Sequence, residues 1–312
     1  MEFMERPPGY RGPNLDPTGV RLRPKRLADG VYALMAFPPP RDNSGVVIGE
    51  HGALVIDAGI TPAMAHQIQQ TVRRLTDRPI LWLANTVYHG DHTFGNAAFP
   101  TTTRIIASRQ TAASMTDLDA EKRARVQNLY GNLDAIADVT SWRRPDVVLD
   151  DHTEVDLGGR TVQLWHFGPG NSPGDTVVWV PEARAAWTGN MLGHRRVAPM
   201  LLEGGPAPYL DTLARFKSTL DVRTIVPGHG PLADARALDA WMAYLCEVLE
   251  AVTRARRLGL SALATVETVP LPHGHGFPRW HPAARLNRLV LDLHRLNVLA
   301  TYRDLERQPT AA

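Results

Sequence analysis

The fold is decided by residues 81–96, which read LWLANTVYHGDHTFGN. The apolar run that ends at Asn85 has the length and composition of a buried strand, and imidazole, carboxylate and imidazole follow at His89, Asp91 and His92. These side chains supply the N and O donors that zinc accepts, and Gly90 lets the backbone turn tightly between them. The stretch therefore predicts part of a metal site on a loop that follows a strand.

Three later segments carry the distant partners that such a site needs. Residues 168–175 read GPGNSPGD, residues 188–190 read TGN and residues 226–230 read VPGHG, while residues 57–59 upstream read DAG. In this order the segments resemble the ligand-bearing loops of the metallo-β-lactamase superfamily, over roughly residues 30–232. The resemblance implies an α/β fold, a four-layer αββα sandwich, and two blocks of strands followed by helices agree with it. We expect a C-terminal helical extension on this sandwich.

Three positions depart from the family pattern. Val87 stands where the family has the first histidine of its motif, Asn171 replaces the histidine of the Gly-Pro-x-His loop, and Asn190 replaces the metal-bridging aspartate. By this resemblance the first of the family's two metal positions keeps only His89. Valine offers no donor and an amide oxygen is a poor zinc ligand, so we expect a degenerate site that does not hold two ions tightly.

The second metal position keeps more of its ligands, and the resemblance assigns Asp91, His92 and His229 to it. Three strong donors with one open position are typical of catalytic zinc, so we expect one divalent metal ion, zinc first among the candidates. Such an ion favours hydrolysis of a thioester, ester or lactone. His89 is then free to act as a general base or to bind an oxyanion.

The other expected contributors to catalysis are Asn171 and Asn190, which can donate hydrogen bonds to a substrate, together with Asp91. Two other interpretations remain open. Without a metal, the His and Asp cluster can work as acid–base groups in a lyase, cyclase or isomerase. The chain can also be a non-catalytic binding protein that kept the shell of an enzyme.

Substrate contacts are assigned to Tyr88 beside the motif and to His194 and Arg195, which follow the Asn190 loop and can meet an anionic group. Some similar family members act as thioesterases or cyclases in polyketide biosynthesis. By that resemblance we expect a small-molecule substrate with a hydrophobic acyl or aromatic part.

Composition limits the other partners. The 312 residues are 44% hydrophobic, which is enough for a sizeable core, and the formal net charge of +2 gives no field that would favour nucleic acid. No apolar run is long enough to span a membrane and the N-terminus does not read as a signal peptide, so we expect a cytoplasmic protein without a membrane partner. An apolar stripe over residues 286–300 predicts core or homodimer packing.

The chain divides into three predicted segments. Residues 1–22 are expected to form an extended arm, residues 23–258 the metallo-β-lactamase-like domain, and residues 259–312 a loop and helix packed on the same domain. A helix is expected over 118–138, because apolar side chains recur there at helical spacing. The single cysteine, Cys246, is expected to be buried and inert, because Leu245 and Val248 beside it belong to a helical apolar pattern.

Overall fold

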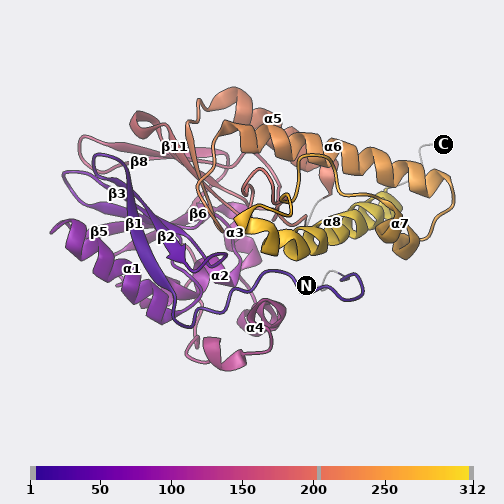
Figure 1. Ribbon diagram of the computed structural model, residues 1–312. Helices are drawn as coiled ribbons and strands as arrows, with labels where there is room; N and C mark the ends of the chain where they lie inside the picture. Colours follow the sequence, from indigo (N-terminus) through magenta and orange to yellow (C-terminus); the bar gives the residue numbers. More distant parts are fainter. Residues whose placement is uncertain (1–4, 202–204, 309–312) are drawn as a thin grey trace.

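Two β-sheets lie face to face at the centre of the computed structural model, which describes residues 5–201 and 205–308 (Figure 1). The larger sheet contains, in spatial order, β1 (Arg21–Ala28), β2 (Val31–Phe37), β3 (Ser44–Ile48), β4 (Ala53–Ile56), β5 (Ile80–Ala84), β6 (Arg104–Ser108) and β7 (Val147–Leu149). The smaller sheet contains β12 (Thr224–Pro227), β11 (Ala185–Gly189), β10 (Val177–Val180), β9 (Thr161–Trp165) and β8 (His152–Asp156).

Each sheet changes from antiparallel to parallel pairing along its width. In the larger sheet β1 to β4 pair antiparallel and β4 to β7 pair parallel, whereas in the smaller sheet only β11 and β12 are parallel. The parallel strands β4, β5 and β6 therefore end at the same edge of the larger sheet, and β11 and β12 end together in the smaller one. The loops at these ends carry the motif residues.

Helices cover the outer face of each sheet. On the larger sheet α1 (Pro62–Leu75) begins at Thr61, whose Oγ1 accepts a hydrogen bond from the Met64 amide at 3.1 Å, and it packs Ile68 and Val72 onto the strands. On the smaller sheet α5 (Pro206–Thr219) and α6 (Ala235–Arg257) lie side by side. Together with the apolar layer between the sheets, these helices confirm the predicted four-layer αββα sandwich.

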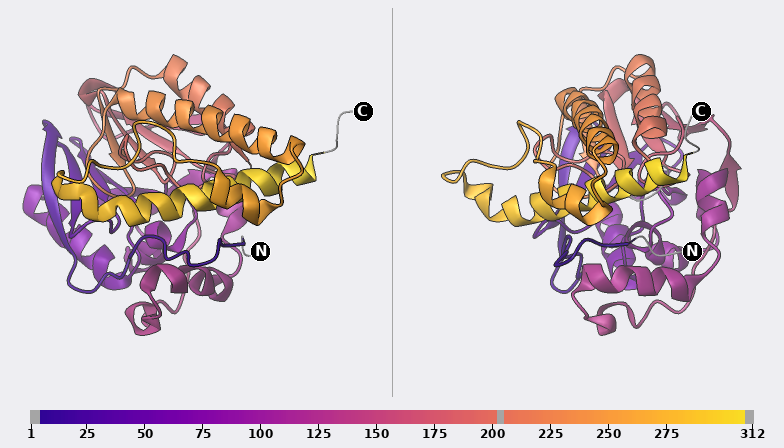
Figure 2. Two further views of the ribbon diagram at one scale, coloured as in Figure 1. Left: turned by 45° about the vertical axis from the view of Figure 1, so that its right-hand side comes forward. Right: turned by 90° about the vertical axis from the view of Figure 1, so that its right-hand side faces the viewer.

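The C-terminal extension continues the helical layer on the side of α6. It consists of α7 (Ala262–Thr268), the short 3-10 helix η5 (Pro282–Leu286) and α8 (Asn287–Arg307). Figure 2 shows α8, in yellow, running alongside α6. Buried polar groups join the two helices: the hydroxyl of Tyr244 on α6 lies 3.0 Å from His294 Nδ1 and accepts a hydrogen bond from Asn297 Nδ2 at 3.2 Å. The expected C-terminal helix is therefore present.

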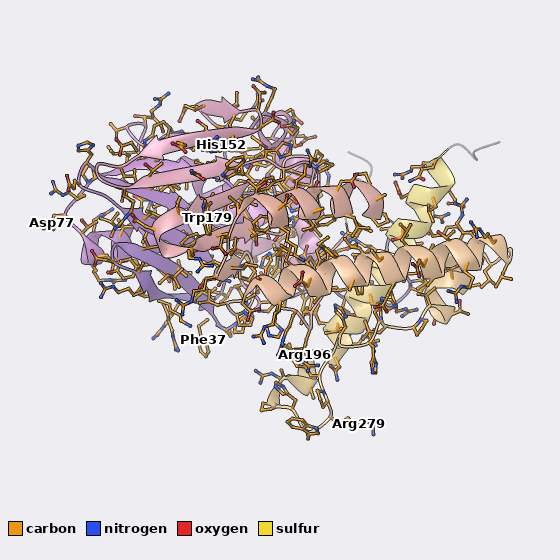
Figure 3. All side chains as sticks on the ribbon, turned by 90° about the horizontal axis from the view of Figure 1, so that it is seen from above. Phe37, Asp77, His152, Trp179, Arg196 and Arg279 are labelled. Atoms are coloured by element: carbon orange, nitrogen blue, oxygen red, sulfur yellow. The ribbon has the colours of Figure 1, made fainter. Side chains whose placement is uncertain are left out.

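The segment before α8 projects from the body of the molecule. Figure 3 shows Arg279 at the outer end of this projection and Arg196 close to its base. The base is fixed by two backbone carbonyls, because the Gly276 amide donates to Arg196 O at 2.9 Å and Arg196 Nη1 donates to Gly276 O at 3.1 Å. These contacts join the projection to the loop that follows β11.

The helix expected over 118–138 is shorter than predicted. α4 (Leu118–Arg125) ends early, and the 3-10 helices η2 (Val126–Leu129) and η3 (Leu133–Ile136) follow it. Tyr130 and Gly131 interrupt the segment because both have positive φ, 53° and 84°, which a right-handed helix does not accommodate. The remaining short helices are α2 (Gly90–Thr93), η1 (Phe94–Ala98), α3 (Arg109–Ser114) and η4 (Pro181–Ala183).

The expectation for Cys246 was wrong, because its side chain is exposed on α6. The buried stripe of α6 includes Trp241, Leu245 and Val248, and Cys246 lies outside that stripe. Across residues 5–201 and 205–308, no helix combines the length and apolar composition that a membrane crossing requires.

Candidate metal centre

The motif residues meet where the parallel strands end. His89 immediately precedes α2, which carries Asp91 and His92, and this short helix follows the loop after β5. Asn190 directly follows β11, and His229 lies two residues beyond β12. Because these strand ends face each other across the sandwich, side chains from distant segments converge at one edge. All five side chains are buried except those of His229 and Asn190, which are partly exposed.

Asp91, His92 and His229 lie together as the sequence predicted, and they form the group that could hold a metal within the described part of the chain. Asp91 Oδ2 lies 3.4 Å from His92 Nε2 and 3.2 Å from His229 Nε2. In a tetrahedral zinc site with bonds of the usual length, ligand atoms lie about 3.3 Å apart. The two distances from Asp91 therefore fit one zinc ion, and the ligand atoms of the three residues all lie within 4.8 Å of one another.

The far side of each imidazole is occupied, which fixes its orientation. His92 Nδ1 lies 2.9 Å from Asp57 Oδ2, and His229 Nδ1 lies 2.8 Å from the carbonyl oxygen of Pro40. Histidine ligands of metals commonly use the second ring nitrogen in this way, donating to a carboxylate or a backbone carbonyl. Both imidazoles consequently present Nε2 to Asp91.

The carboxylate of Asp91 has one satisfied and one unsatisfied oxygen. Its Oδ1 accepts a hydrogen bond from Arg125 Nη1 at 3.0 Å, whereas Oδ2 is buried and accepts no well-directed hydrogen bond. A buried acceptor without a donor is costly, and a cation between this oxygen and the two imidazoles removes the cost. The residues present thus fit a divalent ion.

The pKa shifts in the cluster indicate that its carboxylates stabilise a positive charge. Burial lowers the pKa of His92, but the carboxylates of Asp57 and Asp91 outweigh burial and raise that pKa to about 10. Burial raises the pKa of Asp91, whereas the charges of His92 and Arg125 hold it well below its usual range. Asp91 is therefore ionised, and the two carboxylates favour a cation at His92, either a proton or a metal.

His89 is neutral and is hydrogen-bonded to Asn190. Burial and the nearby charge of Arg125 hold its pKa well below the usual range. Asn190 Nδ2 donates to His89 Nδ1 at 3.0 Å, while Asn190 Oδ1 faces His92 Nε2 at 3.1 Å. With Nδ1 accepting, the hydrogen-bond network assigns the proton of His89 to Nε2. The ring nitrogen that this hydrogen bond leaves available is Nε2.

The other altered positions offer little to a second ion. Asn171 Nδ2 donates to the carbonyl oxygen of Met200 at 2.5 Å, and its Oδ1 is buried without a hydrogen-bond partner. Val87 is fully buried in an apolar cluster with Tyr88, Met115 and the partly buried Trp142. The Val87 side chain thus belongs to the core behind the motif.

A cavity of about 460 Å³ opens above the cluster. Its floor contains His89, Asp91, Asn171, Asn190 and His229. Its walls are mostly apolar and come from the N-terminal arm, from residues 38–40, from the loop after β11 and from η5 and α8; they include Pro13, Leu15, Pro38, Pro39, Leu192, Val197, Met200, Leu286, Leu289 and Leu293. A small polar floor within apolar walls is typical of a small-molecule site.

The predicted substrate contacts are only partly found in this cavity. His194 lines it, but Tyr88 and Arg195 are not among its lining residues. Tyr88 is 2% exposed and packs edge-on against the ring of His89, with the ring centres 4.6 Å apart. It therefore supports His89 from behind. His92 is also absent from the lining, because its side chain is fully buried below the floor.

The structure adds Arg125 and Glu121, which the sequence interpretation missed. Arg125 Nε lies 3.0 Å from Glu121 Oε1, and that oxygen accepts a hydrogen bond from the Gly90 amide at 2.7 Å. The two side chains are four residues apart on α4, a spacing that is typical of an exposed ion pair. Their burial beside Asp91 has no signal in the local sequence, because α4 reads as a charged surface helix.

Comparison with known proteins is consistent with this geometry. The sequence profile described as the metallo-beta-lactamase superfamily matches residues 39–229. A metallo-beta-lactamase from Pontibacter korlensis is 19% identical with a TM-score of 0.57, and the match covers 72% of this chain and 99% of that one. A metallo-beta-lactamase from Erythrobacter litoralis with beta-mercaptoethanol in its active site is 17% identical with a TM-score of 0.58, covering 73% and 97%.

A third similar structure extends further along the chain. It is a double mutant of the sec-alkyl sulfatase PisA1, 11% identical with a TM-score of 0.67, and the match covers 91% of this chain but 50% of that one. At these identities the three structures show a common fold. The wider coverage indicates that the shared arrangement extends beyond the segment matched by the profile.

Proposed function

This chain belongs to the metallo-β-lactamase superfamily, and from that membership we propose that it is a hydrolase that works with one divalent metal ion, zinc first among the candidates. Asp91, His92 and His229 hold this ion. The observation that carries the proposal is the buried, unsatisfied Oδ2 of Asp91, which lies 3.4 Å or less from Nε2 of each histidine.

An ion at this position supplies Lewis acidity and makes water nucleophilic near neutral pH. The chain's own residues provide the rest of the chemistry. Arg125 fixes the carboxylate of Asp91 through its Oδ1, and Asn190 fixes the ring of His89 through its Nδ1. When water adds to an acyl carbon, negative charge develops on the carbonyl oxygen. His89, which lines the cavity, would offer the proton on its Nε2 to that oxygen.

The walls of the cavity support a hydrophobic substrate. Apolar side chains from the arm and from α8 surround a floor with few polar groups, so an acyl chain or an aromatic ring can be buried there while the reacting group reaches His89 and Asp91. We therefore propose a thioester, ester or lactone of a hydrophobic acyl or aromatic compound, in keeping with the resemblance to thioesterases and cyclases of polyketide biosynthesis.

The metal-independent alternative receives less support from the geometry. Its strongest acid–base candidate is the His92 imidazole, but His92 is fully buried and does not line the cavity. His89, which does line the cavity, is held neutral and has its Nδ1 occupied by Asn190. An acid–base reaction in the cavity would have to use His229 and Asp91 as its proton-transferring groups.

A panel of hydrophobic thioesters, esters and lactones tests this proposal. The protein should hydrolyse at least one class, lose that activity after treatment with a chelator, and recover it when zinc is added back. Hydrolysis that persists in the chelated protein would support the acid–base alternative. Metal binding without hydrolysis of any class would support a binding protein.

A further inference from the structure

Arg125 is a buried cation on the floor of the cavity. Its side chain is 10% exposed, yet it is one of the residues that line the cavity. Nη1 donates to Asp91 Oδ1 at 3.0 Å, and Nε lies 3.0 Å from Glu121 Oε1. One carboxylate thus holds Nη1 and a second lies beside Nε, while the Arg125 side chain also contributes to the cavity lining.

Asp91 is the charged neighbour of Arg125 on this floor and already holds its Nη1, whereas three other floor residues carry no charge. His89, Asn171 and Asn190 occupy the positions where the resemblance places ligands and the bridging carboxylate, and only His89 keeps its family residue. The first metal position has therefore lost ligands, while a fixed guanidinium lies on the same floor.

We propose that Arg125 forms an anion-binding subsite for the carboxylate of an apolar acid, the acid product of acyl hydrolysis. The inference rests on the proposed function for the identity of this ligand. A guanidinium is planar and permanently charged, and it matches the two oxygens of a carboxylate. In a largely apolar cavity the attraction is stronger than in water.

The hydrocarbon part of the ligand can pack against the apolar walls of the cavity. Leu286, Leu289 and Leu293 form one wall, and Pro13 and Leu15 of the arm form another. A cavity of about 460 Å³ accepts a medium acyl chain or an aromatic ring. The combined site therefore selects a molecule with one anionic end and one apolar end.

Besides the motif residues His89 and His229, two basic side chains line the cavity and have to be distinguished from Arg125. Burial, with a further contribution from Arg195 and Arg196, lowers the pKa of His194, so this imidazole is neutral at pH 7. Arg285 on η5 also lines the cavity but is exposed to solvent. Its charge is screened by water and salt, which makes Arg285 a matched control for Arg125.

The test compares three probes of one chain length, namely octanoate, octan-1-ol and octylamine. Calorimetry measures their affinities for the protein as purified, after chelation and after zinc loading. We expect octanoate to bind about tenfold or more tightly than the other two probes in all three preparations, since a charge-assisted hydrogen bond contributes that much. Equal affinities for the three probes in the wild-type protein would overturn the proposal, and this comparison needs no variant.

Variants then identify the side chain whose charge produces the preference for octanoate. Arg125→Gln should remove the preference for octanoate, Arg125→Lys should keep a weaker preference, and Arg285→Gln should change it by less than about threefold. Loss of the preference in Arg285→Gln alone would overturn the assignment to Arg125. A preference that appears only with zinc and survives Arg125→Gln would also overturn it, because the metal would then bind the carboxylate. A protein that binds no zinc but keeps the preference would contradict the proposed hydrolase and leave the subsite standing.

Discussion

Asp91 Oδ2 and His229 Nε2 lie 3.2 Å apart without a well-directed hydrogen bond between them. His229 Nδ1 lies 2.8 Å from the carbonyl oxygen of Pro40, to which only an N–H can donate, so Nε2 is the ring nitrogen left for a metal. A cation between Nε2 and the carboxylate oxygen would coordinate both atoms.

Removing His229 should remove the metal. His229→Ala leaves Asp91 and His92 as the only strong donors of the proposed site, so we expect its zinc content to fall to near zero and hydrolysis to be lost. The measurement is elemental analysis with an activity assay. For zinc content, His194→Ala is the control, because it removes an imidazole of the same cavity that belongs to no metal cluster among the described residues. Equal zinc content in wild type and His229→Ala would contradict the assignment.

Asp57 should act on the metal through His92. Asp57→Asn replaces the carboxylate beside His92 Nδ1 by an amide, while the position can still contact Thr86, whose amide and hydroxyl donate to it in the native chain. Loss of such an outer carboxylate typically costs about 10- to 100-fold in metal affinity. Competition with a chromophoric chelator measures the change. An unchanged affinity would mean that Asp57 is needed for folding alone.

Restoring the family ligands should need three substitutions together. Val87→His, Asn171→His and Asn190→Asp supply two imidazoles and a bridging carboxylate, and we expect metal stoichiometry to rise toward two. Val87→His alone should not add an ion, because Val87 packs with Met115 in an apolar cluster away from the cavity lining. Elemental analysis measures the number of metal ions per chain in each variant. A second ion bound by the single variant would show that the pocket at Val87 opens to the cavity.

The apolar wall should set the preferred chain length. Leu293 on α8 lines the cavity and is 5% exposed, so Leu293→Ala should enlarge the cavity and lower the free energy of unfolding by about 2–4 kcal/mol. We expect the preferred acyl chain to become longer or wider. Leu291→Ala is the control, since Leu291 lies on the same helix but is 45% exposed. Hydrolysis of substrates of increasing chain length measures the preference, and urea unfolding measures the free energy of unfolding. Identical chain-length preferences in the two variants would contradict the role of α8.

Much of the fold and the metal cluster could be predicted because their signals are local. An apolar strand followed at once by His89, Asp91 and His92 places donors at a strand end, and the later loops with His229 repeat the same relation between strand end and donor. The order of these segments along the chain, which resembles that of the family, then predicts the four-layer sandwich. The positions of Asn171 and Asn190 in the cavity floor follow from the same loops.

The remaining parts of the site depend on tertiary contacts that have no local signal. Glu121 and Arg125 read as an exposed pair on a charged helix, but α4 lies against the motif and buries both. Leu15 belongs to an arm without helical or strand pattern, yet its amide donates to Asn128 O at 2.7 Å and its side chain closes the cavity. Tyr88 was expected in the cavity because it is adjacent to His89, whereas the turn at the motif directs it into the core.

The most direct test is the metal content per chain, measured by elemental analysis on protein purified without chelator and again after dialysis against zinc. The account predicts one divalent ion per chain in the zinc-dialysed sample, and its loss in His229→Ala. A zinc-dialysed wild-type protein that contains no metal would contradict the account, and two tightly held ions would contradict the conclusion that Val87, Asn171 and Asn190 have removed the first position.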